Sequence, residues 1–191
     1  AGLVETRPGR GTYVADDPPL RPVGPPLTQT EVEELVEARV VIEVELARLA
    51  AQRATPEQVA ALRRAVERLD DASASTTSYP DADVDFHLAL AAAANNRYLL
   101  QSMIDIRALL RDDMELGAEA AIRRFGDLRI SVESHRRLVQ AVAARDPEAA
   151  AAIAAEIVNR NRAFVLGLYA LGERDAPGSG LPRSGTGTRK T

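Results

Sequence analysis

The strongest constraint on the fold is a helical spacing of apolar residues that recurs through residues 28–171. Within each stretch, apolar side chains return every three or four residues, which is the repeat of an amphipathic α-helix. The hydrophobic content is 46%, but aromatic residues contribute only 4% and alanine dominates. Such a composition favours tightly packed helices over sheets. We therefore expect an all-α fold, an antiparallel bundle of about six helices.

Capping signals divide this region into separate helices. Thr30-Glu31-Val32-Glu33 reads as a capping box that begins the first helix, and Thr55-Pro56-Glu57-Gln58 begins the second. Asp146-Pro147-Glu148 supplies a cap, a helix-starting proline and a first-turn acid for the sixth. The fourth helix is expected to reach about Leu116. Residues 117–126, bracketed by glycines, predict a short or broken helix.

Both ends of the chain differ from the helical region in composition. Within residues 1–15, β-forming residues flank a Pro-Gly-Arg-Gly turn, which predicts a short β-hairpin. This hairpin is either a frayed arm or the last piece of a domain whose earlier part is absent from the sequence. Residues 16–27 are proline-rich and predict a stiff linker to a helical domain over residues 28–172. Residues 173–191 have the composition of a disordered tail.

Charge and composition limit the classes of partner. The net charge of −4 gives no global attraction to nucleic acid or anionic lipid, so any such contact needs a local basic patch. Arg7 and Arg10, with Gly11 in the hairpin turn, are the candidate DNA-contacting residues. The absence of cysteine excludes disulfides and thiolate zinc sites. The sequence has neither a membrane-spanning run nor a signal peptide, so we expect a cytoplasmic protein with no membrane partner.

The two histidines of the chain lie on apolar helix faces. Asp83 and His87, four residues apart, project from one face of a helix at about 40° to each other. If the helix that carries His135 packs nearby, all three side chains converge inside the bundle. An Asp and two His suit Zn, Ni, Mn or Fe(II), although a lone inward histidine is more often a hydrogen-bonded core residue. Asp85 is expected to point to the opposite, solvated side.

Arg39 and Glu43 lie four residues apart on or beside the apolar stripe of the first helix. They form either a solvated pair at the rim or an inward pair in which Arg39 receives the carboxylate of a ligand. Both are therefore candidate ligand-binding residues. Nucleophilic catalysis has little support, because no Gly-x-Ser-x-Gly motif occurs and Ser131 and Ser134 are expected at the surface. We assign no catalytic residue.

Several short motifs follow one another along the chain in a specific order. They are Gly2-Leu3-Val4, Pro8-Gly9-Arg10-Gly11-Thr12-Tyr13-Val14, Glu37-Ala38-Arg39 with Ile42-Glu43, Asp83 with Phe86-His87, Asn96, His135 with Val139 and Ala141-Val142, and Asp146-Pro147-Glu148-Ala149-Ala150. The first two resemble the wing of the winged helix-turn-helix in GntR-family transcription regulators. The others resemble the effector-binding and dimerisation (FCD) domain of the FadR-type branch.

This resemblance implies a homodimeric, DNA-binding transcription regulator. Its helical domain would bind a small organic acid, a carboxylate effector, and control binding of the winged helix domain to operator DNA. In many relatives an Asp and three His hold a divalent metal, and Asp83, His87 and His135 match three of these ligands. The fourth is expected near Ile157, which cannot coordinate, and Glu156 is the nearest acid. The helix-turn-helix itself, with its recognition helix, is not in this sequence.

Two other functions remain open from the residues alone. A small all-helical metal-dependent hydrolase would activate water at an open metal position, with Glu43 as the candidate general base. A helical interaction module would use the alanine-rich sixth helix as a surface for a partner.

Overall fold

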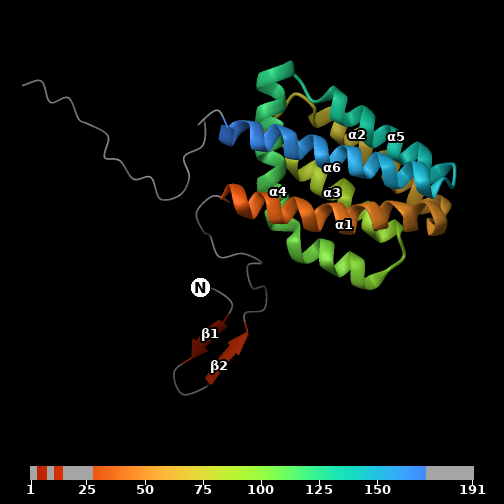
Figure 1. Ribbon diagram of the computed structural model, residues 1–191. Helices are drawn as coiled ribbons and strands as arrows, with labels where there is room; N and C mark the ends of the chain where they lie inside the picture. The colour runs from red at the N-terminus through yellow and green to blue at the C-terminus, as the bar shows by residue number, and fades with distance from the viewer. Residues whose placement is uncertain (1–3, 8–10, 15–27, 171–191) are drawn as a thin grey trace, which may run out of the picture.

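The computed structural model describes residues 4–7, 11–14 and 28–170, and six helices occupy the last of these ranges (Figure 1). The helices are α1 (Gln29–Arg53), α2 (Pro56–Ala72), α3 (Tyr79–Ala93), α4 (Arg97–Phe125), α5 (Arg129–Ala143) and α6 (Pro147–Ala170). Two short strands, β1 (Val4–Arg7) and β2 (Gly11–Val14), pair antiparallel, with Val4 opposite Val14. In the described part of the chain, no helix is both long enough and apolar enough to cross a membrane.

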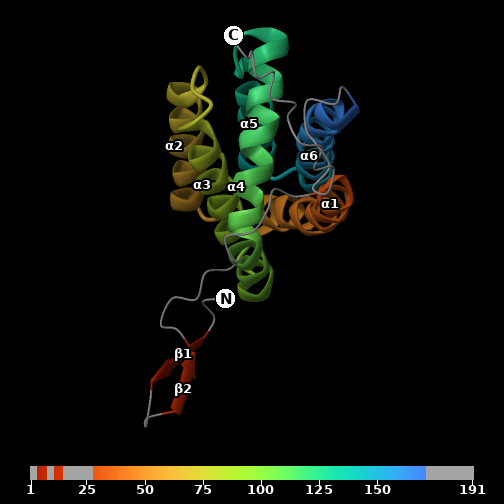
Figure 2. The ribbon, with the colours of Figure 1, turned by 90° about the vertical axis from the view of Figure 1, so that its left-hand side faces the viewer.

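The helices pack around α1. Helix α6 lies along α1, and α3, α4 and α5 also contact it (Figures 1 and 2). Helix α2 packs against α3 and α5. In Figure 1 the part of α4 that ends at Phe125 stands at a steep angle to α1 and α6.

The structure corrects the expected fold class. The folded domain is helical throughout residues 28–170, and the hairpin expected before the bundle is no part of it, because β1 and β2 contact none of the helices among the described residues. The bundle is not regularly antiparallel, since the part of α4 that ends at Phe125 stands at a steep angle to α1 and α6 (Figure 1). Residues 117–126 do not form a short or broken helix, because α4 continues to Phe125. The tail expected over residues 173–191 lies outside the described residues.

The capping signals locate most helix starts. Thr55 caps α2 through a capping box with Gln58, and Asp146 accepts a hydrogen bond from the backbone N–H of Ala149 at 3.0 Å, as the sequence predicts. The cap of α1 lies two residues earlier than predicted, at Thr28. Residues 28–31 and 30–33 share the same Thr-x-x-Glu pattern, and the earlier box lets the helix begin at Gln29.

Gly117 explains why α4 continues through a position that reads as a break. The glycine is inside the helix, and a Cβ there would overlap Oδ1 of Asn161 on α6. The missing side chain therefore allows Asn161 to approach α4 closely. There Nδ2 of Asn161 donates a hydrogen bond of 2.6 Å to Oδ2 of Asp113. Gly117 therefore allows close contact between α4 and α6 and does not end α4.

We predict that Gly117→Ala unfolds at lower urea concentration than Gly167→Ala. The first substitution displaces the Asn161 amide from the buried Asp113, which costs about 1–3 kcal/mol. Gly167 lies in α6 where a new Cβ meets no atom within 4 Å, so its replacement by alanine gains up to about 1 kcal/mol. Equal free energies of unfolding for the two variants would contradict this role of Gly117.

Candidate metal centre

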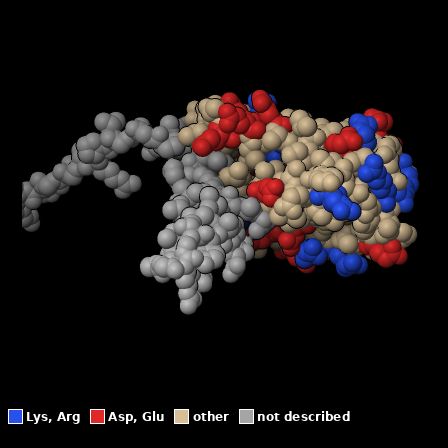
Figure 3. All heavy atoms as spheres, turned by 90° about the horizontal axis from the view of Figure 1, so that it is seen from below, with Lys and Arg blue, Asp and Glu red and all other residues tan. Residues whose placement is uncertain are grey.

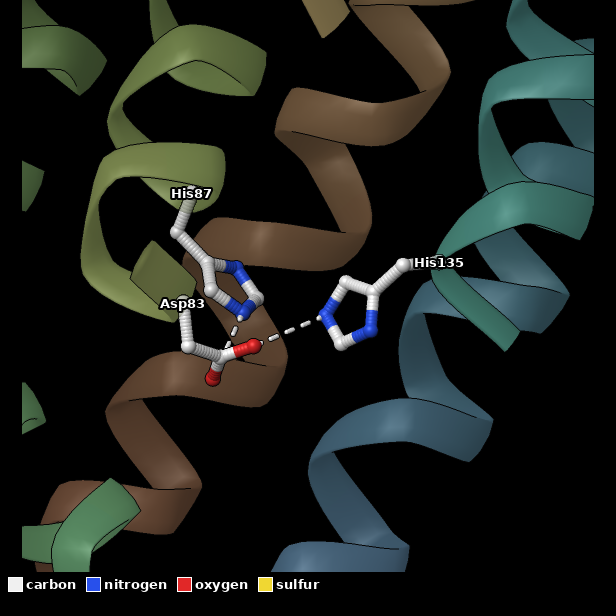
Figure 4. A group of neighbouring side chains, drawn as sticks. All are labelled: Asp83, His87 and His135. Carbon is white, nitrogen blue, oxygen red and sulfur yellow. Dashed lines mark ion pairs between the residues drawn. The ribbon is translucent and has the colours of Figure 1, made fainter. Parts of the chain in front are cut away.

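Two helices that both pack on α1 carry the three candidate ligands. Asp83 and His87 lie one turn apart on α3, and His135 lies on α5 (Figure 4). Their exposed fractions are 6%, 2% and 1%. One ligand atom from each residue lies within 4.8 Å of the other two. The acid and both imidazoles therefore converge inside the helical domain.

The contacts of His135 determine which ring nitrogen carries the proton. Nδ1 lies 2.8 Å from the carbonyl oxygen of Ser131. Because a carbonyl oxygen only accepts, this contact favours the proton on Nδ1. Nε2 then presents a lone pair 3.3 Å from Oδ1 of Asp83. A lone pair and a carboxylate oxygen repel each other at this distance unless a proton or a cation lies between them.

His87 has the same arrangement with a different partner. Its Nδ1 forms an ion-pair contact of 2.8 Å with Oε2 of Glu43. The carboxylate favours the imidazole proton on Nδ1 and leaves Nε2 facing Oδ2 of Asp83 at 3.8 Å. Both rings thus direct Nε2 to one carboxylate while a protein oxygen orients Nδ1. Metal-bound histidines in proteins are typically oriented in this way.

Five buried side-chain atoms have no hydrogen-bond partner among the described residues. Three of them, Oδ1 of Asp83, Nε2 of His87 and Nε2 of His135, face the centre of the site, and Oδ1 of Asp113 lies in the neighbouring cluster. The fifth is Nδ1 of His87, whose 2.8 Å contact with Glu43 is an ion pair rather than a hydrogen bond. A buried polar atom without a partner costs about 1–3 kcal/mol. A divalent metal ion would satisfy the three central atoms at once, and a carboxylate with two imidazoles is a suitable ligand set. These residues therefore fit a metal ion.

A second buried cluster adjoins the site and links α1 to α4. Nε of Arg39 donates to Oε1 of Glu43 at 2.8 Å, and Nη1 donates to Oδ2 of Asp113 at 2.5 Å. The three residues are at most 1% exposed. Arg39 and Glu43 are therefore not a solvated pair at the rim. Arg39 points inward, and its acceptors are carboxylates of the protein itself.

Burial and neighbouring charges set the pKa values in this cluster. Burial alone would raise the pKa of Glu43, but Arg39 and His87 outweigh burial and lower this pKa from 4.5 to about 2. Burial raises the pKa of Asp113, and Arg39 only partly offsets the rise. Burial lowers the pKa of His135. For His87, burial also lowers the pKa, but the negative charges of Glu43 and, to a smaller extent, Asp83 outweigh burial, and the net shift is upward.

A cavity of about 30 Å³ lies beside Asp83 and His135, two of the three candidate ligands. A cavity needs roughly 10–15 Å³ to hold one water molecule, so this one has room for about two. Asp83, His135 and Ile157 contribute to its wall. Position 157, where the resemblance implies a fourth ligand, thus carries an apolar side chain beside the site. Glu156 is not part of the wall and forms an ion pair with Arg160.

The two serines near His135 differ from the surface positions expected for them. Ser134 is 2% exposed, and its hydroxyl donates to the carbonyl oxygen of Ile130 at 3.1 Å. Ser131 is half-buried and accepts a 2.9 Å hydrogen bond from the hydroxyl of Tyr79. The surface expectation is wrong because this part of α5 packs against α6.

The candidate DNA-contacting residues lie apart from this site. Arg7 is the last residue of β1 and Gly11 is the first residue of β2, directly opposite it. Arg10 and the linker over residues 16–27 lie outside the described residues.

Sequence reasoning misses three polar residues of this region. Asp113 follows Leu110 by three residues and therefore lies on the apolar stripe of α4. An acid in such a stripe needs a buried partner, and this signal was available in the sequence. Asn161 and Arg160 lie one turn beyond Ile157 and share its face of α6. They become recognisable once residue 157 is placed beside the site.

Comparison with known proteins agrees with this architecture. Residues 34–160 match the FCD domain. The HTH-type transcriptional regulator LutR of Bacillus subtilis (strain 168) is 30% identical over 172 residues, which cover 83% of this chain and 75% of that protein. The structure of Streptococcus agalactiae GntR has a TM-score of 0.60 and 22% identity, and the match covers 85% of this chain and 75% of that one. E. coli McbR/YncC has a TM-score of 0.61 and 22% identity, covering 87% and 78% of the two chains.

The two structural matches support the fold, and the family match and LutR support the function. The relatives are regulators rather than enzymes, which decides against a metal-dependent hydrolase. The low pKa of Glu43 agrees, because a general base is most effective when its pKa lies near the working pH. The chain therefore belongs to the FCD-domain, FadR-type branch of the GntR family of transcriptional regulators.

Proposed function

We propose that the helical domain of this regulator senses a small organic acid through one divalent metal ion held by Asp83, His87 and His135. The observation that carries the proposal is the convergence of three buried atoms without hydrogen-bond partners among the described residues. Zn²⁺, Ni²⁺ or Mn²⁺ suits this ligand set. Such an ion would supply a Lewis-acidic position for one oxygen of the acid.

Charge balance supports a dication at this site. Among the described residues, the buried charged side chains outside the two imidazoles are Arg39, Glu43, Asp83 and Asp113. With all three acids ionised, one guanidinium leaves two negative charges uncompensated. Uncompensated charge in a protein interior is costly, and a divalent cation would cancel it. The pKa of Asp113 is raised mainly by burial, and the charge of Glu43 adds a smaller rise.

Arg39 and Glu43 support this site in different ways. Arg39 contributes to the cavity wall and provides positive potential there, although both of its described acceptors are protein carboxylates. Glu43 holds Nδ1 of His87 and thereby directs Nε2 to the metal position. Glu43 is thus a positioning residue in the proposal rather than a ligand of the acid.

For the whole regulator we propose a homodimer in which residues 28–172 bind the effector and dimerise. Residues 1–15 would be the wing, and Arg7, Arg10 and Gly11 would contact operator DNA. On the face of the domain seen in Figure 3, basic groups gather mainly at one end and acidic groups at the other. The acid would act by binding one arrangement of the dimer more tightly.

We expect Asp83→Ala to abolish stoichiometric metal binding by the purified protein, because it removes the only carboxylate of the ligand set. Asp85→Ala is the matched control, since Asp85 is exposed on the same helix. Metal content is measured by elemental mass spectrometry after incubation with Zn²⁺ or Ni²⁺ and desalting. Full metal content in Asp83→Ala would refute the proposed site.

We expect Glu43→Gln to weaken metal affinity by about 10-fold while one ion still binds at saturation, because the substitution weakens the partner that orients His87. Glu45→Gln is the control, since Glu45 is an exposed acid of the same helix. Competition with a chelating dye measures both affinities. Wild-type affinity in Glu43→Gln would show that this acid does not support the metal site.

A further inference from the structure

Arg160 on α6 is the second guanidinium in the wall of the cavity, in addition to Arg39. Its Nη1 donates to Oγ of Ser134 at 2.7 Å and to the carbonyl oxygen of Ile130 at 3.1 Å. Its Nη2 forms an ion pair with Glu156, one turn earlier on the same helix. The side chain is 22% exposed, so Arg160 connects the cavity with solvent.

Arg39 is poorly suited to bind a further carboxylate. Its Nε and Nη1 already serve Glu43 and Asp113, and the whole residue is 1% exposed. Removing a guanidinium from buried carboxylates leaves uncompensated charge in the core, which typically costs about 3–5 kcal/mol. An incoming acid would therefore have to compete with two buried anions for Arg39.

An acid that binds Arg160 would have to displace only Glu156, which is held more weakly than the buried carboxylates that bind Arg39. The Glu156 side chain is 39% exposed, and it also lies 3.3 Å from Arg137. The pair is only part-buried, so solvent screens it far more than the buried ion pairs of Arg39, and a fully exposed pair contributes only about 0–1 kcal/mol. On leaving Arg160, Glu156 would keep both water and Arg137 as partners. The guanidinium can thus exchange this partner at low cost, which is not true of Arg39.

The size and charge of the cavity also favour an exchange at Arg160. The present volume of about 30 Å³ is too small for most organic acids, so a side chain of the wall must move. With a divalent ion in place, the buried acids and Arg39 would sum to zero charge. An added carboxylate then needs one more positive charge, and among the described residues of the wall Arg160 provides it.

We propose that Arg160 binds the carboxylate of the effector and gives up Glu156 when it does so. This inference rests on the proposed acid-sensing function and adds the residue that selects for a carboxylate. Arg160 and Glu156 then act in opposite directions. Arg160 provides affinity for the acid, and Glu156 competes with the acid for the same guanidinium.

The experiment uses the full chain loaded with Co²⁺, whose visible absorption changes when a new ligand enters its coordination sphere. Acetate is the probe, and the variants are Arg160→Gln, Glu156→Gln and the control Arg162→Gln, an exposed arginine on the same helix. We expect Arg160→Gln to bind Co²⁺ normally but to need at least about 10-fold more acetate, because a charge-assisted hydrogen bond is lost. Glu156→Gln should need several-fold less acetate, and Arg162→Gln should match the wild type.

The outcomes separate this inference from the metal site. Wild-type acetate affinity in Arg160→Gln overturns the inference while the metal site stands. If Arg160→Gln fails to fold, Glu156→Gln decides, and unchanged or weaker acetate binding in that variant overturns the inference. A wild type that takes up no Co²⁺ contradicts the metal site. In that case Arg160 is tested by the rise in melting temperature that acetate causes. This rise should need more acetate in Arg160→Gln, less acetate in Glu156→Gln, and the wild-type amount in Arg162→Gln.

Discussion

The interaction on which the site depends is the bridge that Glu43 makes between Arg39 and His87. One carboxylate oxygen accepts from the guanidinium and the other lies 2.8 Å from the imidazole Nδ1. Arg39 keeps this acid ionised in the core, as its lowered pKa shows, and the ionised acid sets the orientation of His87. The direction of Nε2 towards Asp83 follows from that orientation. The geometry of the candidate metal centre thus begins with a salt bridge on another helix.

The sequence predicts local features of this fold well and contacts between distant helices poorly. The cap at Thr55 and the shared face of Asp83 and His87 depend on residues within one or two turns, and the structure has both. The sequence does not predict the continuous helix across Gly117, because the residue that requires this glycine, Asn161, is more than forty positions away. It does not predict the buried position of Asp113 either, because the partner of this acid, Arg39, is 74 positions away. Local rules cannot identify a partner that only the tertiary packing brings close.

The apolar residue at position 157 leaves the candidate metal site with three protein ligands instead of four. Three protein ligands leave more of the coordination sphere open than four do, so the ion would depend more on an exogenous oxygen. The surplus of buried negative charge compensates in part, because it attracts a dication without adding a ligand. Affinity for the metal and affinity for the acid would consequently be coupled. The acid would supply an oxygen ligand that the metal needs, and the metal would supply positive charge that the acid needs. A site with a complete set of four protein ligands would couple them less strongly.

This coupling also indicates how binding at the site would reach the rest of the regulator. Arg160 and its partner Glu156 lie on α6, which packs along α1, and α1 begins directly after the segment that follows the hairpin. Packed helices shift as units, because their close-packed interfaces do not deform continuously. A displacement of α6 on partner exchange would therefore move the first turn of α1. Under this proposal, the free energy available for regulation would be limited to the difference in acid affinity between the two arrangements, and DNA would have to change acid affinity by the same factor.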